Sequence, residues 1–261
     1  MAHQALNIGE YSVFLEETSS TNETLKTLYS AEPLPEGALV YAHYQTAGRG
    51  YLQNVWESEK GENLLASVLL KPQFLQAEEQ IWLNVVVSLA LRELAETYSK
   101  VQATIKWPND IYIQQNKVAG ILIENTLQGS KIKHSIIGIG LNINQQHFKN
   151  EKAASLFHFA GFRFEPKELR LALCAQLNHF YGLLRGKQFN LLWDLYHKHL
   201  MGKGQYAQFK KGSVLFEGLI MGIDKKGRLH LEVEEEVRCF VHKEIEFVQL
   251  INPSTNAHTG N

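Results

Sequence analysis

The chain has few cysteines, no long apolar run and almost no net charge, and each absence excludes a class of protein. Only two cysteines, Cys174 and Cys239, occur in 261 residues, so we expect two buried free thiols rather than a disulfide framework. No apolar run is long enough to span a bilayer, and the N-terminus lacks the pattern of a signal peptide. The formal net charge of −1 argues against binding to nucleic acid or to a membrane surface. A reduced, cytoplasmic protein is therefore expected.

Several signatures of nucleotide-binding and hydrolytic enzymes are also missing. The sequence contains no P-loop, no Gly-x-Ser-x-Gly elbow and no His-Glu-x-x-His motif. Gly138 and Gly140 lack the third glycine and the following helix of a dinucleotide-binding fingerprint. Any nucleotide must therefore bind through loops and the edges of a sheet.

The composition is that of a globular protein, 44% hydrophobic and 20% charged, and the pattern changes near residue 201. Residues 1–200 predict strands mixed with helices, which form one α+β domain. Short strands and turns over residues 201–251 predict a small closed barrel of five strands, and the polar tail 252–261 is expected to be disordered. The predicted strands before residue 201 are 10–16, 38–45, 63–70, 103–107, 111–113, 118–123 and 135–144. The predicted helices are 20–29, 76–99, 166–184 and 189–200.

The most informative feature is Lys-Trp-Pro-Asn-Asp at 106–110, followed by Lys-Val-Ala-Gly at 117–120. The first motif separates two β-rich runs and predicts a turn in which Asn109 and Asp110 bond their own backbone. One interpretation is a well-formed hairpin corner. The other is an anion-binding corner, in which Lys106 and Lys117 provide positive charge beside the carboxylate of Asp110.

Two further motifs offer groups that bind ligands. Gln-Thr-Ala-Gly-Arg-Gly at 45–50 follows a strand and is either a flexible turn or a place where backbone amides and Arg49 meet an anion. The long loop behind it carries Trp56, which either pins the loop to the core or forms an apolar wall against a ligand. Ser-Thr-Asn at 20–22 begins a helix, where Ser20 and Glu23 predict a capping box and free N–H groups suit a neutral polar ligand.

Together these motifs resemble the biotin protein ligases, and the resemblance runs from about residue 19 to residue 144. It is carried by the motifs at 20–22, 45–50, 106–110 and 117–124, and by Gly-Ile-Gly-Leu-Asn-Ile-Asn at 138–144. The resemblance implies a catalytic domain with a mixed sheet, as in class II aminoacyl-tRNA synthetases, and an SH3-like C-terminal barrel. It implies an enzyme that uses ATP and Mg²⁺ to form biotinyl-5′-AMP and transfers biotin to a lysine of a biotin carboxyl carrier protein.

The resemblance also implies a role for individual residues. The implied catalytic residues are Lys117, Arg49 and Asp110. The implied biotin-binding residues are Ser20, Thr21, Asn22, Gln45, Gly48, Arg49, Gly50, Tyr51 and Lys117. The implied nucleotide-binding residues are Arg49, Trp56, Lys106, Asn109, Lys117 and Asn142. For three of these a purely structural role is the alternative: a sheet-edge lysine at Lys106, a turn-capping carboxylate at Asp110 and a strand-end amide at Asn142. Asp110 is implied to position either the attacking lysine or a metal ion, and the metal ligands otherwise stay unassigned.

The sequence departs from the family pattern in two places. Tyr51 stands where many members carry another arginine, so we expect this enzyme to lose its adenylate intermediate faster. The short segment before Ser20 has no room for the winged helix-turn-helix of repressor-type members, so a monofunctional ligase is expected.

Two alternative functions and two questions of assembly stay open. The alternatives are a lipoate or octanoate ligase and a non-catalytic biotin-binding module. An exposed sheet edge would suit the carrier or a second subunit, so a homodimer stays open. The barrel is either a structural cap or a part that closes the ATP site or docks the carrier.

Overall fold

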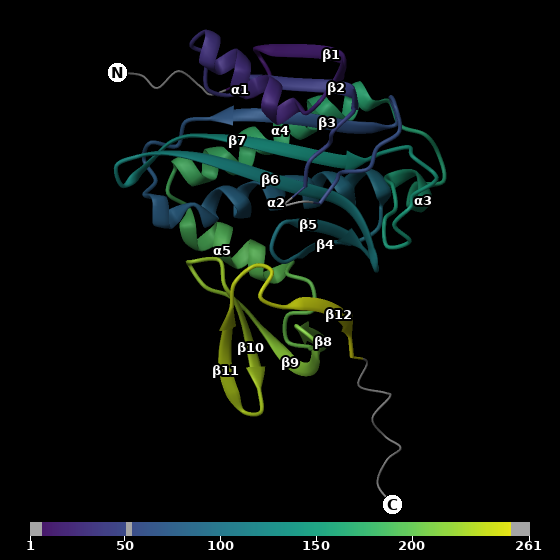
Figure 1. Ribbon diagram of the computed structural model, residues 1–261, viewed down its shortest axis with the longest axis vertical. Coiled ribbons are helices and arrows are strands. Elements are labelled where there is room, and N and C mark those ends of the chain that lie inside the picture. Colours follow the sequence, from purple (N-terminus) through teal and green to yellow (C-terminus); the bar gives the residue numbers. More distant parts are fainter. Residues whose placement is uncertain (1–6, 51–53, 252–261) are drawn as a thin grey trace, which may run out of the picture. The chain divides into compact units, whose positions relative to one another are not determined.

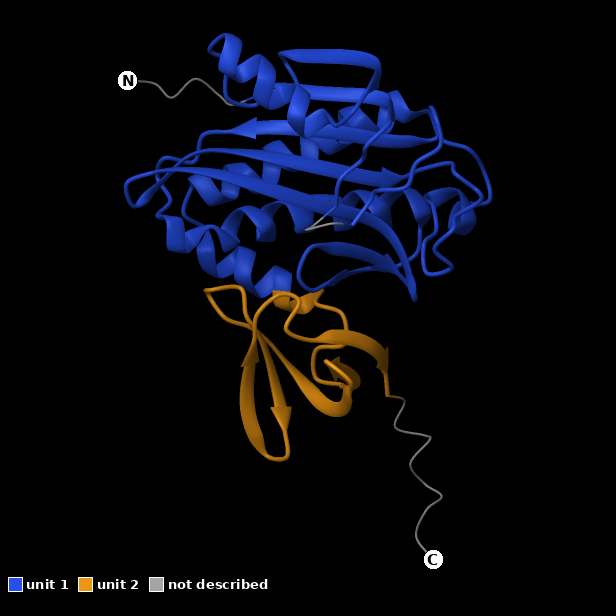
Figure 2. Cartoon of the chain, viewed as in Figure 1, with its two compact units in different colours: residues 1–196 blue, residues 197–261 orange. Residues whose placement is uncertain are grey.

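The structure of the protein is a computed structural model that describes residues 7–50 and 54–251. The chain divides into two units, residues 1–196 and residues 197–261 (Figure 2). Two predictions, the tail 252–261 and the role of Tyr51, lie outside the described residues.

Unit 1 contains a seven-stranded mixed sheet with the strand order β1-β2-β3-β7-β6-β5-β4 (Figure 1). β1 and β2 are parallel, and every other neighbouring pair is antiparallel. The predicted α+β class is therefore confirmed. The strands are β1 Ser12–Thr18, β2 Leu39–Gln45, β3 Asn63–Leu70, β4 Ala103–Lys106, β5 Asp110–Ile113, β6 Asn116–Gln128 and β7 Lys131–Asn142.

Helices cover both faces of this sheet. α1 (Thr21–Ala31) packs on β2, β3 and β7, whereas α2 (Ile81–Ser99) and α4 (Pro166–Arg185) form a layer on the other face (Figure 1). All eight residues of β3 are buried, because α1 covers one face of the strand and the α2–α4 layer covers the other. This explains why β3 is a continuous apolar run rather than an alternating one.

The predicted helix at 76–99 is two elements. A 3-10 turn, η1 (Ala77–Glu79), begins at a capping box between Gln76 and Glu79, and α2 follows it from Ile81. Two short helices complete the helical elements, α3 (Leu156–Ala160) and α5 (Phe189–Lys198). α3 was not predicted, because five residues are too few to show helical periodicity.

The corner between β4 and β5 is held by neighbouring elements rather than by its own side chains. Lys106 and Asp110 face each other across the turn. The side chain of Asn109 donates to Ile121 O of β6 at 2.6 Å, and Asn84 of α2 donates to Pro108 O at 2.5 Å. The prediction that Asn109 bonds its own turn is therefore wrong. Its amide joins the corner to the next strand, which fixes Asp110 relative to β6.

Unit 2 contains a five-stranded antiparallel sheet with the order β11-β10-β9-β8-β12, so the predicted number of strands is confirmed. Both cysteines are free, but only Cys174 is buried. Cys239 is exposed because it lies on β11, an end strand of this sheet, so its predicted burial is wrong. The strands are β8 Tyr206–Lys211, β9 Val214–Ile223, β10 Leu229–Val233, β11 Glu236–Phe240 and β12 Glu246–Leu250.

In the described part of the chain, no helix combines the length and the apolar character needed to cross a membrane.

Candidate active site

Two glycines on neighbouring strands form a flat floor under Trp56. Gly120 of β6 pairs with Gly140 of β7. A Cβ atom at Gly120 would lie 3.0 Å from Cζ3 of Trp56, and one at Gly140 would lie 2.6 Å from Cζ2. Only glycine lets the indole lie this close to the backbone. Trp56 therefore pins its loop to the sheet, and its buried Nε1 has no hydrogen-bond partner among the described residues.

The segment around Arg49 is folded back on the residues that precede Trp56. Trp56 N donates to Gly48 O at 2.9 Å, and Gly50 N donates to Asn54 O at 2.7 Å. A Cβ atom at Gly48 would lie 2.7 Å from Trp56 O, which explains the glycine at this position. Residues 48–50 are therefore joined by backbone hydrogen bonds to residues 54–56.

A lysine–carboxylate pair lies beside the indole. Lys117 Nζ is 2.6 Å from Asp110 Oδ1 and 5.6 Å from the centroid of the Trp56 ring. Lys106 Nζ lies 3.2 Å from the Tyr112 hydroxyl and 4.7 Å from its ring centroid. Burial, and then the charge of Asp110, raises the pKa of Tyr112, so its hydroxyl stays protonated. Two cations and one carboxylate are thus gathered at this corner.

A buried group of polar side chains lies at the start of α1. Gln45 Oε1 accepts from Thr21 N at 2.7 Å and from the Thr21 hydroxyl at 3.0 Å. The Ser67 hydroxyl is 2.7 Å from Thr21 Oγ1 and 2.5 Å from Asn22 Oδ1. Gly138 lies directly beneath, where a Cβ atom would come within 2.6 Å of Asn22 Oδ1. The glycine lets the helix end approach β7.

The predicted capping box at the start of α1 is wrong. Ser20 is at the N-cap position and buried, but its side chain makes no capping hydrogen bond. Gln45, at the end of β2, instead satisfies the backbone N–H of Thr21. A residue from a neighbouring strand has therefore taken over the capping function, which leaves Glu23 available for other partners.

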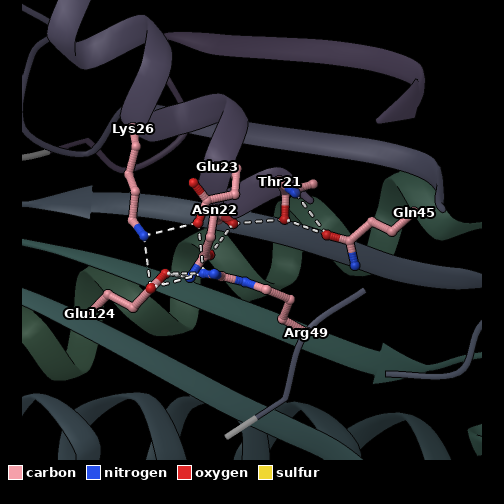
Figure 3. Close-up of polar contacts among 8 residues, drawn as sticks. Thr21, Asn22, Glu23, Lys26, Gln45, Arg49 and Glu124 are labelled. Atoms are coloured by element: carbon pink, nitrogen blue, oxygen red, sulfur yellow. Dashed lines mark hydrogen bonds and ion pairs between the residues drawn. The ribbon is translucent and has the colours of Figure 1, made fainter. Parts of the chain in front are cut away.

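Four charged side chains form a cluster next to this polar group (Figure 3). Arg49 Nη2 lies 2.8 Å from Glu124 Oε1 and 2.8 Å from Glu23 Oε1. Lys26 Nζ lies 2.7 Å from Glu124 Oε1 and 3.0 Å from Glu23 Oε1. Asn22 Nδ2 donates to Glu124 Oε2 at 2.6 Å. Burial acts to raise the pKa of Glu124, but the hydrogen bonds and positive charges of these partners outweigh it and lower that pKa.

Comparison with known proteins agrees with this geometry. Residues 14–142 match the model of the biotin/lipoate A/B protein ligase family. The bifunctional ligase/repressor BirA of Bacillus subtilis is 33% identical over 248 residues, which are 92% of this chain and 74% of that protein. The chain belongs to this family. The human biotin–protein ligase is also similar, with 34% identity over 150 residues, 55% of this chain and 20% of that protein.

A solved structure of the family has the same fold. The biotin protein ligase from Aquifex aeolicus, in complex with biotin and ATP, superimposes with a TM-score of 0.76 at 28% identity. The alignment covers 92% of this chain and 99% of that one. The resemblance inferred from the sequence motifs is therefore confirmed at the level of family and fold.

Half of the predicted site residues form one series of contacts on the α1 face of the sheet. This series of contacts runs from Thr21 through Gln45 to Gly48, and from there through Trp56 to Lys117 and Asp110. Arg49 branches from it to Glu124.

Asn142 and Asn109 point to backbone atoms instead. Asn142 Nδ2 donates to Ala154 O at 3.0 Å, and its buried Oδ1 lacks a partner within the described residues. Asn109 donates to β6, as described above.

Sequence reasoning missed the residues that hold this site together, namely Glu23, Lys26, Ser67 and Glu124. Glu124 was visible as a carboxylate in a strand that is otherwise largely apolar, and that was a usable signal. Ser67 had a similar signal, because it is the one hydroxyl in the apolar run of β3. Neither signal identifies the partner, because Glu124 meets residues 75 to 102 positions away in the sequence.

Proposed function

We propose that this protein is an ATP-dependent biotin ligase. It activates biotin as biotinyl-5′-AMP and transfers the biotinyl group to a lysine of a biotin carboxyl carrier protein. The observation that carries this proposal is the single contact chain that joins a buried polar group at α1 to the Lys117–Asp110 pair. One end of this series of contacts suits a neutral ring, and the other end suits a carboxylate that becomes an acyl-phosphate anhydride.

The start of α1 is our proposed site for the ureido ring of biotin. That ring is flat and neutral, with one carbonyl acceptor and two N–H donors, so it needs hydroxyl and amide partners rather than charges. Thr21, Asn22 and Gln45 provide such groups, and the backbone around Ser20 closes the same helix end. Gly48 lies next to Gln45 along the same series of contacts, where its backbone would meet the rest of the ligand.

The opposite end of the chain is our proposed site for the nucleotide. Lys117 and Arg49 would neutralise the biotin carboxylate and the α-phosphoryl group to which it becomes bonded, and Lys106 would add charge at the corner. The indole of Trp56 is an aromatic surface for a base. The unpartnered Oδ1 of buried Asn142 is an acceptor that an amino group of adenine would satisfy. Asn109 would contribute by holding the corner in place.

The proposed reaction has two steps. An oxygen of the biotin carboxylate bonds to the α-phosphorus of ATP while the bond to pyrophosphate breaks. The amine of the carrier lysine then bonds to the carbonyl carbon, and AMP leaves with the oxygen it gained. Asp110, which lies 2.6 Å from Lys117 Nζ, is our candidate to accept a hydrogen bond from the incoming amine and orient it.

The family also implies Mg²⁺. Among the described residues no group of three or more His, Cys, Asp or Glu side chains could hold a metal ion. An ion that is bound mainly through phosphate oxygens needs few protein ligands, and Asp110, which pairs with Lys117, is the carboxylate at the corner that would reach it. The ion would supply charge neutralisation of the phosphates when ATP is bound.

The class of protein that accepts biotin and the cellular compartment of the ligase are also part of our proposal. Ligases of this type modify biotin carboxyl carrier proteins, and a homodimer remains a prediction. We propose a cytoplasmic location because both cysteines are free thiols.

The decisive assay is biotin-dependent exchange between ATP and pyrophosphate, with Mg²⁺ and without carrier. We expect exchange with biotin and none with lipoate, and we expect Lys117→Ala to lower the rate at least about 100-fold, as for loss of a charged transition-state partner. Exchange with lipoate or octanoate but not with biotin would assign the chain to that other class of ligase. Absence of exchange with every acid would leave a biotin-binding module, which calorimetry with biotin would then test.

A further inference from the structure

Glu124 connects three parts of the site that are far apart in the sequence. It lies on β6, and it contacts Asn22 and Lys26 of α1 and Arg49 of the segment after β2 (Figure 3). Its side chain is 28% exposed, so it is sheltered enough for these contacts to be specific and strong. The carboxylate is therefore more than a solvated surface charge.

The contact with Arg49 fixes only one side of the guanidinium. The contacts to Glu124 Oε1 at 2.8 Å, to Glu124 Oε2 at 3.0 Å and to Glu23 Oε1 at 2.8 Å all use Nη2. The guanidinium is planar and carries five N–H donors. Nε and Nη1 have no partner among residues 7–50 and 54–251, so with Nη2 bound their donors face a possible anion in a defined orientation.

The contact with Asn22 sets the orientation of an amide. Asn22 donates from Nδ2 to Glu124, and its Oδ1 accepts from Ser67 at 2.5 Å. Because a carboxylate accepts but cannot donate, Glu124 dictates which end of the amide faces it.

We propose that Glu124 is a positioning residue that holds Arg49 by Nη2, so that its remaining donors meet the carboxylate end of biotin. This rests on the proposed function. Glu124 itself does not touch the reacting atoms. Its effect is to pre-organise a cation that would otherwise sample many rotamers, which lowers the entropy lost on binding. Lys26 keeps the cluster neutral, so Arg49 is oriented without being surrounded by excess negative charge.

Glu124→Gln separates this role from the orientation of Asn22. Glutamine has nearly the same shape and keeps one oxygen that accepts from Asn22, but it lacks the charge that holds Arg49. The matched control is Glu93→Gln on α2, which removes a carboxylate that lies 2.8 Å from Arg92 on the other face of the sheet. Glu93→Gln loses the ion pair with Arg92, whereas Glu124→Gln loses those with Lys26 and Arg49, and only Glu124 is next to the proposed ligand site.

The experiment measures the KM for biotin and kcat in pyrophosphate exchange, together with thermal unfolding. We expect Glu124→Gln to raise the KM about tenfold, as for loss of a charged hydrogen bond, with kcat within about twofold of wild type. Glu93→Gln should leave both constants unchanged. A KM for Glu124→Gln equal to that of wild type would overturn the proposal.

A double-mutant cycle with Arg49→Ala tests whether the effect passes through Arg49. If it does, Glu124→Gln adds little once Arg49 is absent, whereas two additive effects would refute it. Should Glu124→Gln fail to fold, Glu124→Asp keeps the charge but draws the carboxylate back from Nη2 by one methylene, and a KM unchanged in that variant would also contradict the proposal. Lack of exchange by wild type would instead contradict the proposed function, so the two failures are distinguishable.

Discussion

The close contact between Trp56 and the glycine floor makes a specific prediction for Gly140→Ala. The added Cβ would lie 2.6 Å from Cζ2 and 2.8 Å from Cδ2 of the indole, well inside van der Waals contact. Relief requires the ring or β7 to move, and overpacking of this kind costs about 1–3 kcal/mol of unfolding free energy. The backbone of Gly140 itself needs no left-handed conformation, so any cost comes from the indole.

The same change should weaken nucleotide binding. If the indole is a wall of the ATP site, its displacement weakens ATP binding by a similar free energy. That free energy corresponds to a KM for ATP raised by roughly 5- to 100-fold. Urea unfolding gives the stability, and pyrophosphate exchange at varied ATP gives the KM. Gly182→Ala is the matched control, because no atom lies within 4 Å of its added Cβ on α4. That control should be stabilised by about 0.5–1 kcal/mol.

The result that would refute this explanation comes from making the same substitution in a protein that already lacks the indole. In Trp56→Ala the clash cannot occur, so adding Gly140→Ala should cost almost nothing further. If Gly140→Ala destabilises the Trp56→Ala protein as much as it destabilises wild type, the indole is not the cause. The stacking of Trp56 on this floor would then be the wrong explanation for the glycine.

Two further changes test the corner and unit 2. Asn109→Ala removes the bond to Ile121 O, and we expect a loss of about 1 kcal/mol in urea unfolding with slower pyrophosphate exchange, because Asp110 is no longer fixed. An exchange rate equal to wild type would show that the corner is rigid without it. In unit 2, burial tends to raise the pKa of Asp224, but hydrogen bonds from Arg228 and His230 lower it to about 2. A lowered pKa stabilises the fold above the unfolded value near 3.8, and this is lost as pH falls toward 2. Asp224→Asn should therefore cost on the order of 1 kcal/mol at pH 7 and nothing near pH 2, by thermal unfolding, and a pH-independent difference would contradict this.

Local sequence determined the elements and the family. β3 was predicted with its exact bounds because a short, mostly apolar run follows a glycine-rich loop, and the start of α4 was predicted because Pro166 marks its first turn. The motifs at 45–50, 106–110 and 117–120 identified the family without any tertiary information. Each of these signals lies within a few residues of the structure that it predicts.

Tertiary structure alone decided how the site is held together. Gln45 rather than Ser20 caps α1, Asn109 bonds β6 rather than its own turn, and Glu124 binds Arg49 from 75 positions away. A local sequence pattern shows which hydrogen bonds a side chain can donate or accept, but the partner depends on which strands become neighbours. Since β7 lies between β3 and β6, residues distant in the sequence meet on one face of the sheet. That strand order cannot be predicted from any single segment of the sequence.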